Sequence, residues 1–153
     1  MYETVYLTRK GLKELRKEIA QLERNINHER NLLRELDKVD SHEERFQRVE
    51  SLSRIENLES QMLEKKFQLE HAKPLPRKRD TLKVALGSAV DLIDSHGRLF
   101  RYTIVDSIEA NPSDGRISAD SPLGKNLLGR KLNDSINWST RYNYSNLKLV
   151  GIS

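Results

Sequence analysis

From Leu12 to Ala72 the chain contains neither glycine nor proline. Because these residues are the strongest helix breakers, such a run favours long, uninterrupted helices. Apolar residues recur at steps of three and four through most of the run, and one polar stretch, residues 37–44, interrupts them. A connection of so few residues joins antiparallel neighbours. The sequence therefore predicts two helices that fold back on each other.

Each predicted helix has about 28 residues and would be roughly 40 Å long. Thr8 is the predicted N-cap of the first helix. Its apolar seam alternates steps of three and four, with a gap near Glu29 and Arg30: Leu12, Leu15, Ile19, Leu22, Ile26, Leu33 and Leu36. In the second helix we assign the seam, with a weak point at Lys65 and Lys66, to Phe46, Val49, Leu52, Ile55, Leu58, Met62, Leu69 and Ala72.

The polar stretch between the helices is acidic. Residues 35–44 hold five carboxylates against one basic residue, Lys38: Glu35, Asp37, Asp40, Glu43 and Glu44. Residues 1–73 carry 15 basic and 15 acidic residues, so the net charge of +4 lies entirely in the remainder. That excess fits a nucleic acid, an acidic protein or a nucleoprotein equally well. For the acidic tip, a solvated loop that keeps the hairpin in register is the simpler alternative to a functional role.

From Thr81 the pattern becomes that of strands. Strands are predicted over 84–86, 89–93, 98–106, 116–119, 136–138 and 147–150, with a turn at 95–97 and a loop at 111–115. Between them, Ser121, Pro122 and Gly129 suit the N-cap, the first position and the C-terminal cap of a short helix. Residues 77–80, after Pro74 and Pro76, form a basic linker, for which solvation is favoured over a nucleic-acid contact.

The sequence thus predicts an α+β protein. Its parts are an N-terminal antiparallel α-helical coiled-coil hairpin over 1–75 and a small β-sheet domain with one short helix over 76–153. The absence of cysteine excludes disulfides, thiolate catalysis and cysteine–zinc sites. No apolar stretch approaches the roughly 20 residues that span a bilayer, and the N-terminus has no signal-peptide pattern. We expect a cytoplasmic protein with no membrane association.

Three segments together resemble one family. They are Leu7–Leu15 (LTRKGLKEL), Gly87–Val90 (GSAV) and Ser121–Arg130 (SPLGKNLLGR), and in order and spacing they are similar to bacterial GreA/GreB transcript-cleavage factors. The resemblance implies an FKBP-like C-terminal domain. It also implies a coiled coil that enters the secondary channel of bacterial RNA polymerase. There, tip carboxylates would help to hold a second Mg²⁺ and stimulate cleavage of backtracked RNA near its 3′ end.

The resemblance also implies site residues. The catalytic tip residues would be Asp40, Ser41, Glu43 and Glu44, of which Asp40 and Glu44 would hold Mg²⁺ jointly with the polymerase. The isolated protein would bind no cofactor and would not itself be an enzyme. Counted back from Ala72, Glu44 falls on the family's glutamate and Ser41 on its aspartate.

Two further groups are predicted contacts. Polymerase binding is assigned to Asp120, Ser121, Pro122 and Leu123, for which helix capping is a compatible role. RNA contact is assigned to Arg45, Arg48 and Arg54, since arginine pairs well with phosphate. For these arginines, ion pairs with glutamates of the first helix are the alternative. His42 is expected to be solvated rather than a metal ligand.

Other functions stay open. The tip, in which Ser41 falls on the family's aspartate, also fits a channel-binding regulator that inhibits or modulates the polymerase without cleavage. A prolyl isomerase would need a pocket built from aromatic residues such as Phe100, Tyr102, Trp138, Tyr142 and Tyr144. A dimeric coiled-coil scaffold is a third class, whereas an intramolecular hairpin predicts a monomer.

Overall fold

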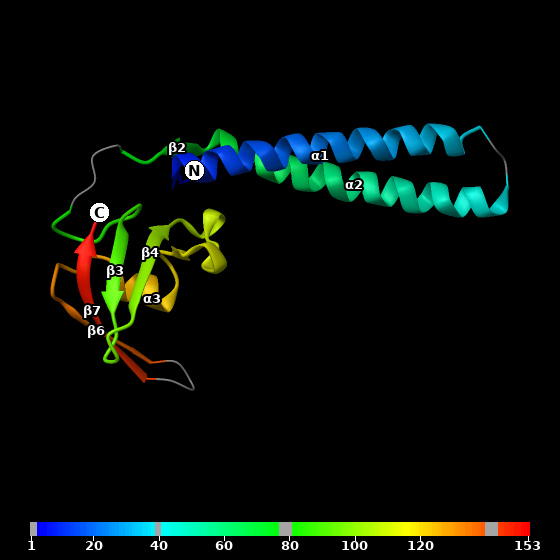
Figure 1. The fold of residues 1–153 in the computed structure, drawn as a ribbon. Helices are drawn as coiled ribbons and strands as arrows, with labels where there is room; N and C mark the ends of the chain where they lie inside the picture. Colours follow the sequence, from blue (N-terminus) through cyan, green and yellow to red (C-terminus); the bar gives the residue numbers. More distant parts are fainter. Residues whose placement is uncertain (1–2, 39–40, 77–80, 140–143) are drawn as a thin grey trace. The chain divides into compact units, whose positions relative to one another are not determined.

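The computed structural model describes residues 3–38, 41–76, 81–139 and 144–153 (Figure 1). The chain divides into two compact units. One contains Lys10–Ala72, and the other contains Val5–Arg9 together with Lys73–Ser153. None of the helices in the described part of the chain combines the length and the apolar character needed to span a bilayer.

The first unit is a two-helix arm formed by α1 (Arg9–Leu36) and α2 (His42–Glu70). The two helices run side by side, and α2 begins at the same end of the arm at which α1 ends (Figure 1). Ion pairs cross between the two sides of the hairpin, and residues near the start of α1 pair with residues late in α2, whereas residues near or just after its end pair with earlier ones: Glu18–Lys65, Glu23–Lys66, Glu29–Arg54, Arg30–Glu59 and Asp37–Arg48. The helices are therefore antiparallel, and the predicted hairpin is confirmed.

The seam of α1 is largely as predicted, but the distal seam of α2 is not. Ile55 is buried, whereas Phe46, Val49 and Leu52 are 66%, 64% and 49% exposed. A step of three residues falls about 60° short of a full helical turn. Side chains related by repeated steps of three therefore drift progressively around the helix. Nine residues make about two and a half turns, which places Phe46 opposite Ile55. The seam instead passes through Ser51, which is 1% exposed.

A polar layer occupies the gap that the seam of α1 leaves near Glu29. The Ser51 hydroxyl donates to Oε2 of Glu29 at 3.2 Å, and Arg54 Nε donates to the same oxygen at 3.3 Å. The Glu29 side chain is 17% exposed. Because a polar group inside a coiled coil has partners at only one position, this layer favours a single register of the two helices.

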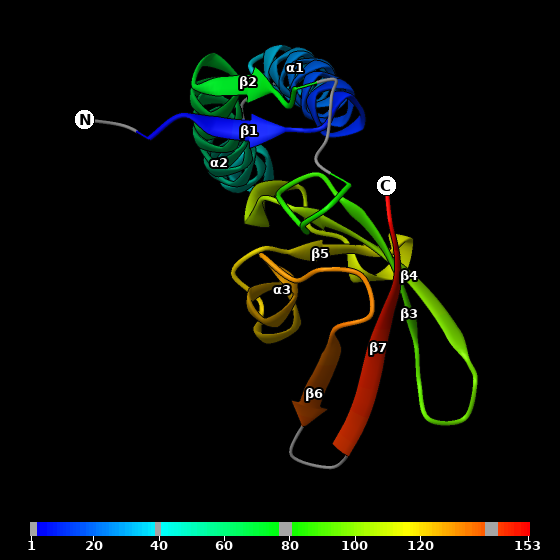
Figure 2. The same cartoon turned by 90° about the vertical axis from the view of Figure 1, so that its left-hand side faces the viewer.

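The second unit is built on a five-stranded sheet in the order β5-β4-β3-β7-β6 (Figure 2). The strands are β3 (Ala89–Ile93), β4 (Leu99–Val105), β5 (Arg116–Ser118), β6 (Ser135–Ser139) and β7 (Tyr144–Ile152). β4 and β5 are parallel, and the other neighbours are antiparallel. The short helix α3 (Pro122–Leu127) and the 3-10 turns Ser107–Glu109 and Pro112–Asp114 complete the unit, so the α+β class is confirmed.

Alternating residues of the strands form the core of this unit. Val90, Leu92, Ile104, Ile136 and Leu149 are at most 1% exposed, and Leu123 and Leu127 of α3 pack with them. Successive side chains of a strand point to opposite faces, so one face of the sheet supplies this apolar layer.

Two elements differ from the sequence prediction. Residues 84–86 are not a strand, because Val84 is held by the loop after α3: its N–H donates to the Arg130 carbonyl at 2.9 Å, and its carbonyl accepts from Gly129 at 2.8 Å. The sequence also gave no sign of a two-stranded sheet between β1 (Val5–Leu7) and β2 (Ala72–Pro74). Strands of three residues are too short for a period-two pattern to be recognised.

A buried carboxylate lies in the second unit. The Glu109 side chain is 3% exposed and is paired with Arg116, Nη1 to Oε2, at 3.4 Å. It also accepts from Thr8, at 2.7 Å from the backbone N–H and 2.6 Å from the hydroxyl. A buried charge needs such partners to offset its desolvation.

Candidate functional site

Helix α2 begins with a capping box at the tip of the arm. The N-cap is Ser41, and its hydroxyl oxygen accepts from the Glu44 N–H at 3.2 Å. The Glu44 carboxylate in turn accepts from the Ser41 N–H at 3.2 Å and from the Ser41 hydroxyl at 2.8 Å. The sequence signal for this motif, serine followed three residues later by glutamate, is present at 41–44, but our sequence analysis did not recognise it.

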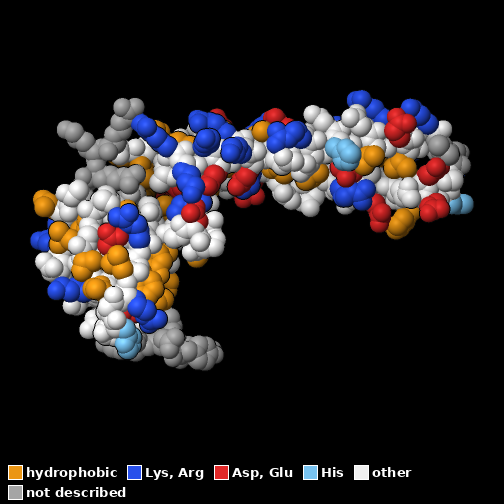
Figure 3. Space-filling model, viewed as in Figure 1, with side chains coloured by type: hydrophobic (Ala, Val, Ile, Leu, Met, Phe, Trp, Pro, Cys, Tyr) orange, Lys and Arg blue, Asp and Glu red, His pale blue; other side chains and the backbone are white. Residues whose placement is uncertain are grey.

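The other tip carboxylates have different surroundings. Asp37 pairs with Arg48 at 2.6 Å, and Glu35 pairs with Lys38 at 2.9 Å. Glu43 is exposed and makes no hydrogen bond or ion pair with the residues that the structure describes. Asp40, a predicted Mg²⁺ ligand, lies outside the described residues. The space-filling view shows acidic side chains at this end of the arm (Figure 3).

Close to the tip the two helices enclose a groove of about 330 Å³. Its lining includes Leu32 and Leu36 from α1 and Glu44, Gln47 and Ser51 from α2. The Glu44 side chain therefore lies where an apolar wall meets a polar one. Among the described residues, no three side chains of histidine, cysteine, aspartate or glutamate are arranged to hold a metal ion. The described tip residues alone do not form a closed Mg²⁺ site.

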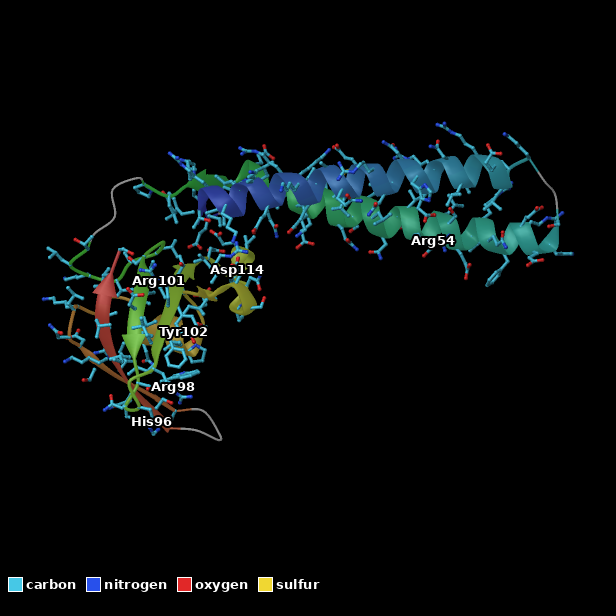
Figure 4. All side chains as sticks on the ribbon, viewed as in Figure 1. Arg54, His96, Arg98, Arg101, Tyr102 and Asp114 are labelled. Carbon is cyan, nitrogen blue, oxygen red and sulfur yellow. The ribbon has the colours of Figure 1, made fainter. Side chains whose placement is uncertain are left out.

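Two of the three arginines predicted to contact RNA form ion pairs between the helices. Arg48 pairs with Asp37, and Arg54, labelled in Figure 4, pairs with Glu29. Such ion pairs with the first helical segment are what the sequence analysis gave as the alternative to RNA contact. Both arginine side chains nevertheless remain about half exposed, at 42% and 52%. Arg45 is exposed at the tip. RNA contact by the three arginines stays a prediction.

The predicted polymerase-binding segment forms the start of α3. The Ser121 hydroxyl accepts from the Gly124 N–H at 3.0 Å and donates to the Ser118 carbonyl at 2.6 Å. Pro122 occupies the first turn, as predicted. Asp120 is exposed, whereas Leu123 is 7% exposed and packs in the core. The capping role is confirmed, and it leaves Asp120 and Pro122 at the surface.

An aromatic cavity lies in the second unit. Phe100 and Tyr102 of β4 and Trp138 of β6 line a space of about 100 Å³. The Phe100 and Tyr102 rings are stacked, with centroids 6.4 Å apart and an interplanar angle of 3°. Of the aromatic residues predicted for such a pocket, Tyr142 and the Tyr144 side chain lie outside the described part of the structure.

Comparison with known proteins identifies the family. Residues 79–153 match the family model described as transcription elongation factor, GreA/GreB, C-terminal. Transcription elongation factor GreA of Mycoplasma genitalium is 33% identical over 138 residues, which cover 84% of this chain and 83% of that protein. This chain belongs to the GreA/GreB family. The match reaches well beyond the C-terminal unit, so family membership applies to the arm as well.

Other matches within the family are more local. GreA of Zymomonas mobilis is 48% identical over 54 residues, which cover 35% of this chain and 34% of that protein. The chain spans between 34% and 45% of the length of the curated GreA proteins that it matches at 41–48% identity. Among solved structures, Gfh1 of Thermus aquaticus is similar, with 24% identity, 99% of both chains covered and a TM-score of 0.46.

Proposed function

We propose that this GreA/GreB protein is an elongation factor that binds bacterial RNA polymerase and inserts its arm into the secondary channel. There it stimulates the cleavage of backtracked RNA near the nascent 3′ end. The factor itself is not an enzyme, because the polymerase supplies the reacting groups, and it acts as a monomer in the cytoplasm. One observation carries the proposal: an arm about 40 Å long ends in the exposed carboxylate of Glu43, which pairs with none of the residues that the structure describes.

The chemistry of the tip supports a shared metal site. Mg²⁺ prefers carboxylate oxygens and keeps several of its waters, so one or two carboxylates are a useful contribution. When bound, a second metal ion stabilises the attacking and leaving oxygens of a phosphodiester displacement. Glu43 and Glu44, with Asp40, would supply oxygens to it, and the polymerase would supply the remaining ligands.

A second candidate is a channel-binding regulator that modulates the polymerase without cleavage. The observation that favours it is that two tip carboxylates already have partners within the arm. Glu44 is held by Ser41, and Asp37 is held by Arg48. A carboxylate must leave these partners before it can bind a metal ion.

The test is RNA cleavage in a stalled, backtracked elongation complex with Mg²⁺. The wild-type protein is compared with Glu43→Ala, Glu44→Ala and Ser41→Ala, and with Glu56→Ala as a matched change far from the tip. Binding to the polymerase is measured in parallel by competition with a labelled wild-type protein. Since Glu44→Ala also removes half of the capping box, Ser41→Ala separates loss of the cap from loss of the carboxylate.

The outcomes separate the two candidates. If the leading proposal holds, the wild type and Glu56→Ala release 3′ RNA fragments, and at least one of the glutamate variants at the tip binds without stimulating cleavage. If the wild type binds but releases no fragments, the protein is a regulator of the second kind. If the wild type does not bind the polymerase, both candidates fail.

A further inference from the structure

Helix α1 begins without the negative charge that favours a helix N-terminus. Its first turn contains no acidic residue, whereas Arg9 and Lys10 are both basic. The partial positive charge at a helix N-terminus is stabilised by anions and opposed by cations. By contrast, α2 carries Glu43 and Glu44 in its first turn. An anion supplied from elsewhere in the chain would therefore stabilise the start of α1.

Glu109 supplies that anion from 101 residues away. Its carboxylate accepts two hydrogen bonds from Thr8, the residue just before α1. Oε1 accepts from the backbone N–H at 2.7 Å, and Oε2 accepts from the hydroxyl at 2.6 Å. Thr8 and Glu109 belong to the same compact unit, and the chain passes into the arm unit at Lys10. The two hydrogen bonds therefore hold the chain just before the arm starts.

The carboxylate that binds Thr8 is itself held in place. Glu109 is the last residue of the 3-10 turn Ser107–Glu109. Nη1 of Arg116 lies 3.4 Å from Glu109 Oε2, and Nε of the same arginine lies 3.0 Å from Asp114 Oδ2. The Glu109 and Arg116 side chains are 3% and 9% exposed. Thr8 is therefore bound to a group that burial and ion pairs keep in position.

A carboxylate holds Thr8 in a way that an apolar contact would not. Apolar contacts are non-directional, whereas hydrogen bonds weaken steeply when their geometry changes. Two hydrogen bonds to the two oxygens of one carboxylate fix both the position and the direction of Thr8. Burying charges costs free energy, and well-packed apolar residues are often at least as stable. Control of geometry is thus what this arrangement adds over an apolar contact.

The length of the arm makes this control important. The 28 residues of α1 extend about 40 Å. A rotation of about 5° at the start of a rod of this length moves its far end by about 3.5 Å. A misplacement of about 1 Å can lower the rate of a catalysed reaction about a hundredfold. Small changes of direction at Thr8 would therefore reach the tip of the arm as large displacements.

We propose that Glu109 is a positioning residue, which holds Thr8 so that the arm starts from a fixed point. Where it concerns cleavage, the inference rests on the proposed function, because there the tip acts inside the polymerase. Loss of the hydrogen bonds to Thr8 should lower the maximal rate of RNA cleavage. It should leave unchanged the concentration of protein that gives half of that rate.

The variants separate this role from a general loss of stability. Thr8→Val is the principal variant, because valine keeps the shape of threonine and leaves the pair of Glu109 and Arg116 intact. Glu109→Gln is the second variant, since it keeps an acceptor oxygen and removes the charge. Thr8→Ser retains the hydroxyl and should behave like the wild type. Thr4→Val changes an exposed threonine near the same end of the chain and is the matched control.

The first measurement is amide hydrogen exchange of the full chain, followed by mass spectrometry in the absence of polymerase. In Thr8→Val and Glu109→Gln we expect residues 5–15 to exchange about fivefold faster than in the wild type, the effect of losing one net hydrogen bond. Residues 89–93 of β3 should keep their wild-type exchange in Thr8→Val, which shows that the opening is local. Thr8→Ser and Thr4→Val should match the wild type throughout.

The second measurement is cleavage in the backtracked elongation complex over a range of protein concentrations. For Thr8→Val we expect a maximal rate at least about threefold lower, with a half-saturating concentration within about twofold of the wild-type value. Thr8→Ser should restore the maximal rate. A loss of stability alone would instead raise the half-saturating concentration, because a smaller fraction of the protein would be folded.

Two results would overturn the proposal. One is unchanged exchange of residues 5–15 in both Thr8→Val and Glu109→Gln. The other is faster exchange together with an unchanged maximal rate, since Glu109 would then have a structural role only. Failure of the proposed function is distinguishable, because the wild type would then release no RNA fragments at any concentration. In that case the exchange comparison alone decides whether Glu109 holds Thr8.

Discussion

Ser41 and Glu44 form a reciprocal pair of hydrogen bonds at the first turn of α2. Each side chain accepts a hydrogen bond from the backbone N–H of the other residue, and the Ser41 hydroxyl lies 2.8 Å from the Glu44 carboxylate. The two positions that we expect to correspond to the acidic tip of the GreA/GreB family are therefore joined in one capping motif. In this chain both the serine and the glutamate have a structural role, because together they cap the start of α2. Glu43, by contrast, points to no partner among the described residues.

Loss of this motif should destabilise the arm by a measurable amount. Ser41→Ala removes the hydroxyl that caps the helix, and we expect a loss of about 1 kcal/mol in the free energy of unfolding. The measurement is urea unfolding of the arm followed by far-UV circular dichroism. Glu43→Ala, one residue from Glu44 but outside the motif, is the control and should change stability by less than about 0.5 kcal/mol. Equal effects of the two substitutions would contradict the capping assignment.

The assignment of the α2 seam can be tested by a matched pair of aliphatic truncations. Ile55→Ala removes a buried side chain and should cost about 3 kcal/mol. Val49→Ala removes a side chain that is 64% exposed and should change stability by less than about 0.5 kcal/mol. Urea unfolding of both variants provides the comparison. A larger loss of stability for Val49→Ala than for Ile55→Ala would instead support the seam that the sequence prediction assigned.

Gly124 is required by a close backbone approach. A Cβ at this position would lie 2.0 Å from the Ser118 carbonyl oxygen, so Gly124→Ala forces α3 away from the strand before it. We expect a loss of about 3 kcal/mol or more, at the upper end of overpacking effects. Gly97→Ala is the control: its φ of +78° is unfavourable for alanine, but no atom lies within 4 Å.

Backbone strain alone should cost Gly97→Ala about 1–2 kcal/mol. Emission from Trp138 during urea unfolding reports on the unit that contains both glycines. A Gly124→Ala variant as stable as Gly97→Ala would show that α3 moves at little cost, which would contradict the tight approach.

Asp94 should make the stability of the C-terminal unit depend on acidic pH. Burial raises the pKa of this carboxyl, but hydrogen bonds from the backbone and guanidinium of Arg98 and from the His96 N–H outweigh that effect and lower the pKa below its ordinary value. A carboxylate with a lowered pKa in the folded state stabilises the protein above the unfolded pKa, about 3.9 for aspartate, and the stabilisation is lost as pH falls through the folded pKa.

We therefore expect Asp94→Asn to be less stable than the wild type at pH 7, with a difference that shrinks as the pH falls below about 4. Urea unfolding at pH 7, 4 and 3, followed by Trp138 emission, measures that difference. Asp120→Asn, which removes an exposed carboxylate, controls for the change in net charge. A difference that stays constant from pH 7 to 3 would contradict the role of the Asp94 hydrogen bonds.

Local sequence patterns were sufficient to predict the long elements of the fold. The hairpin followed from a run without breakers and a short polar connection, and β3, β4 and β7 followed from alternating residues. The capping residue Ser121 was also predictable, because capping depends on neighbours within one helical turn. The error in the α2 seam was one of phase: repeated steps of three do not stay on one face of a helix with 3.6 residues per turn.

The sequence by itself determined the class of each segment, the family and the acidic character of the tip, since these depend on composition and on neighbours close in the chain. Only the tertiary structure decided which charges are paired. The pairs Arg54–Glu29 and Arg48–Asp37 bring together residues from the two sides of the hairpin, and the cavity brings Phe100 together with Trp138 from non-adjacent strands. Such contacts depend on how elements pack, and no local pattern in a single sequence records that packing.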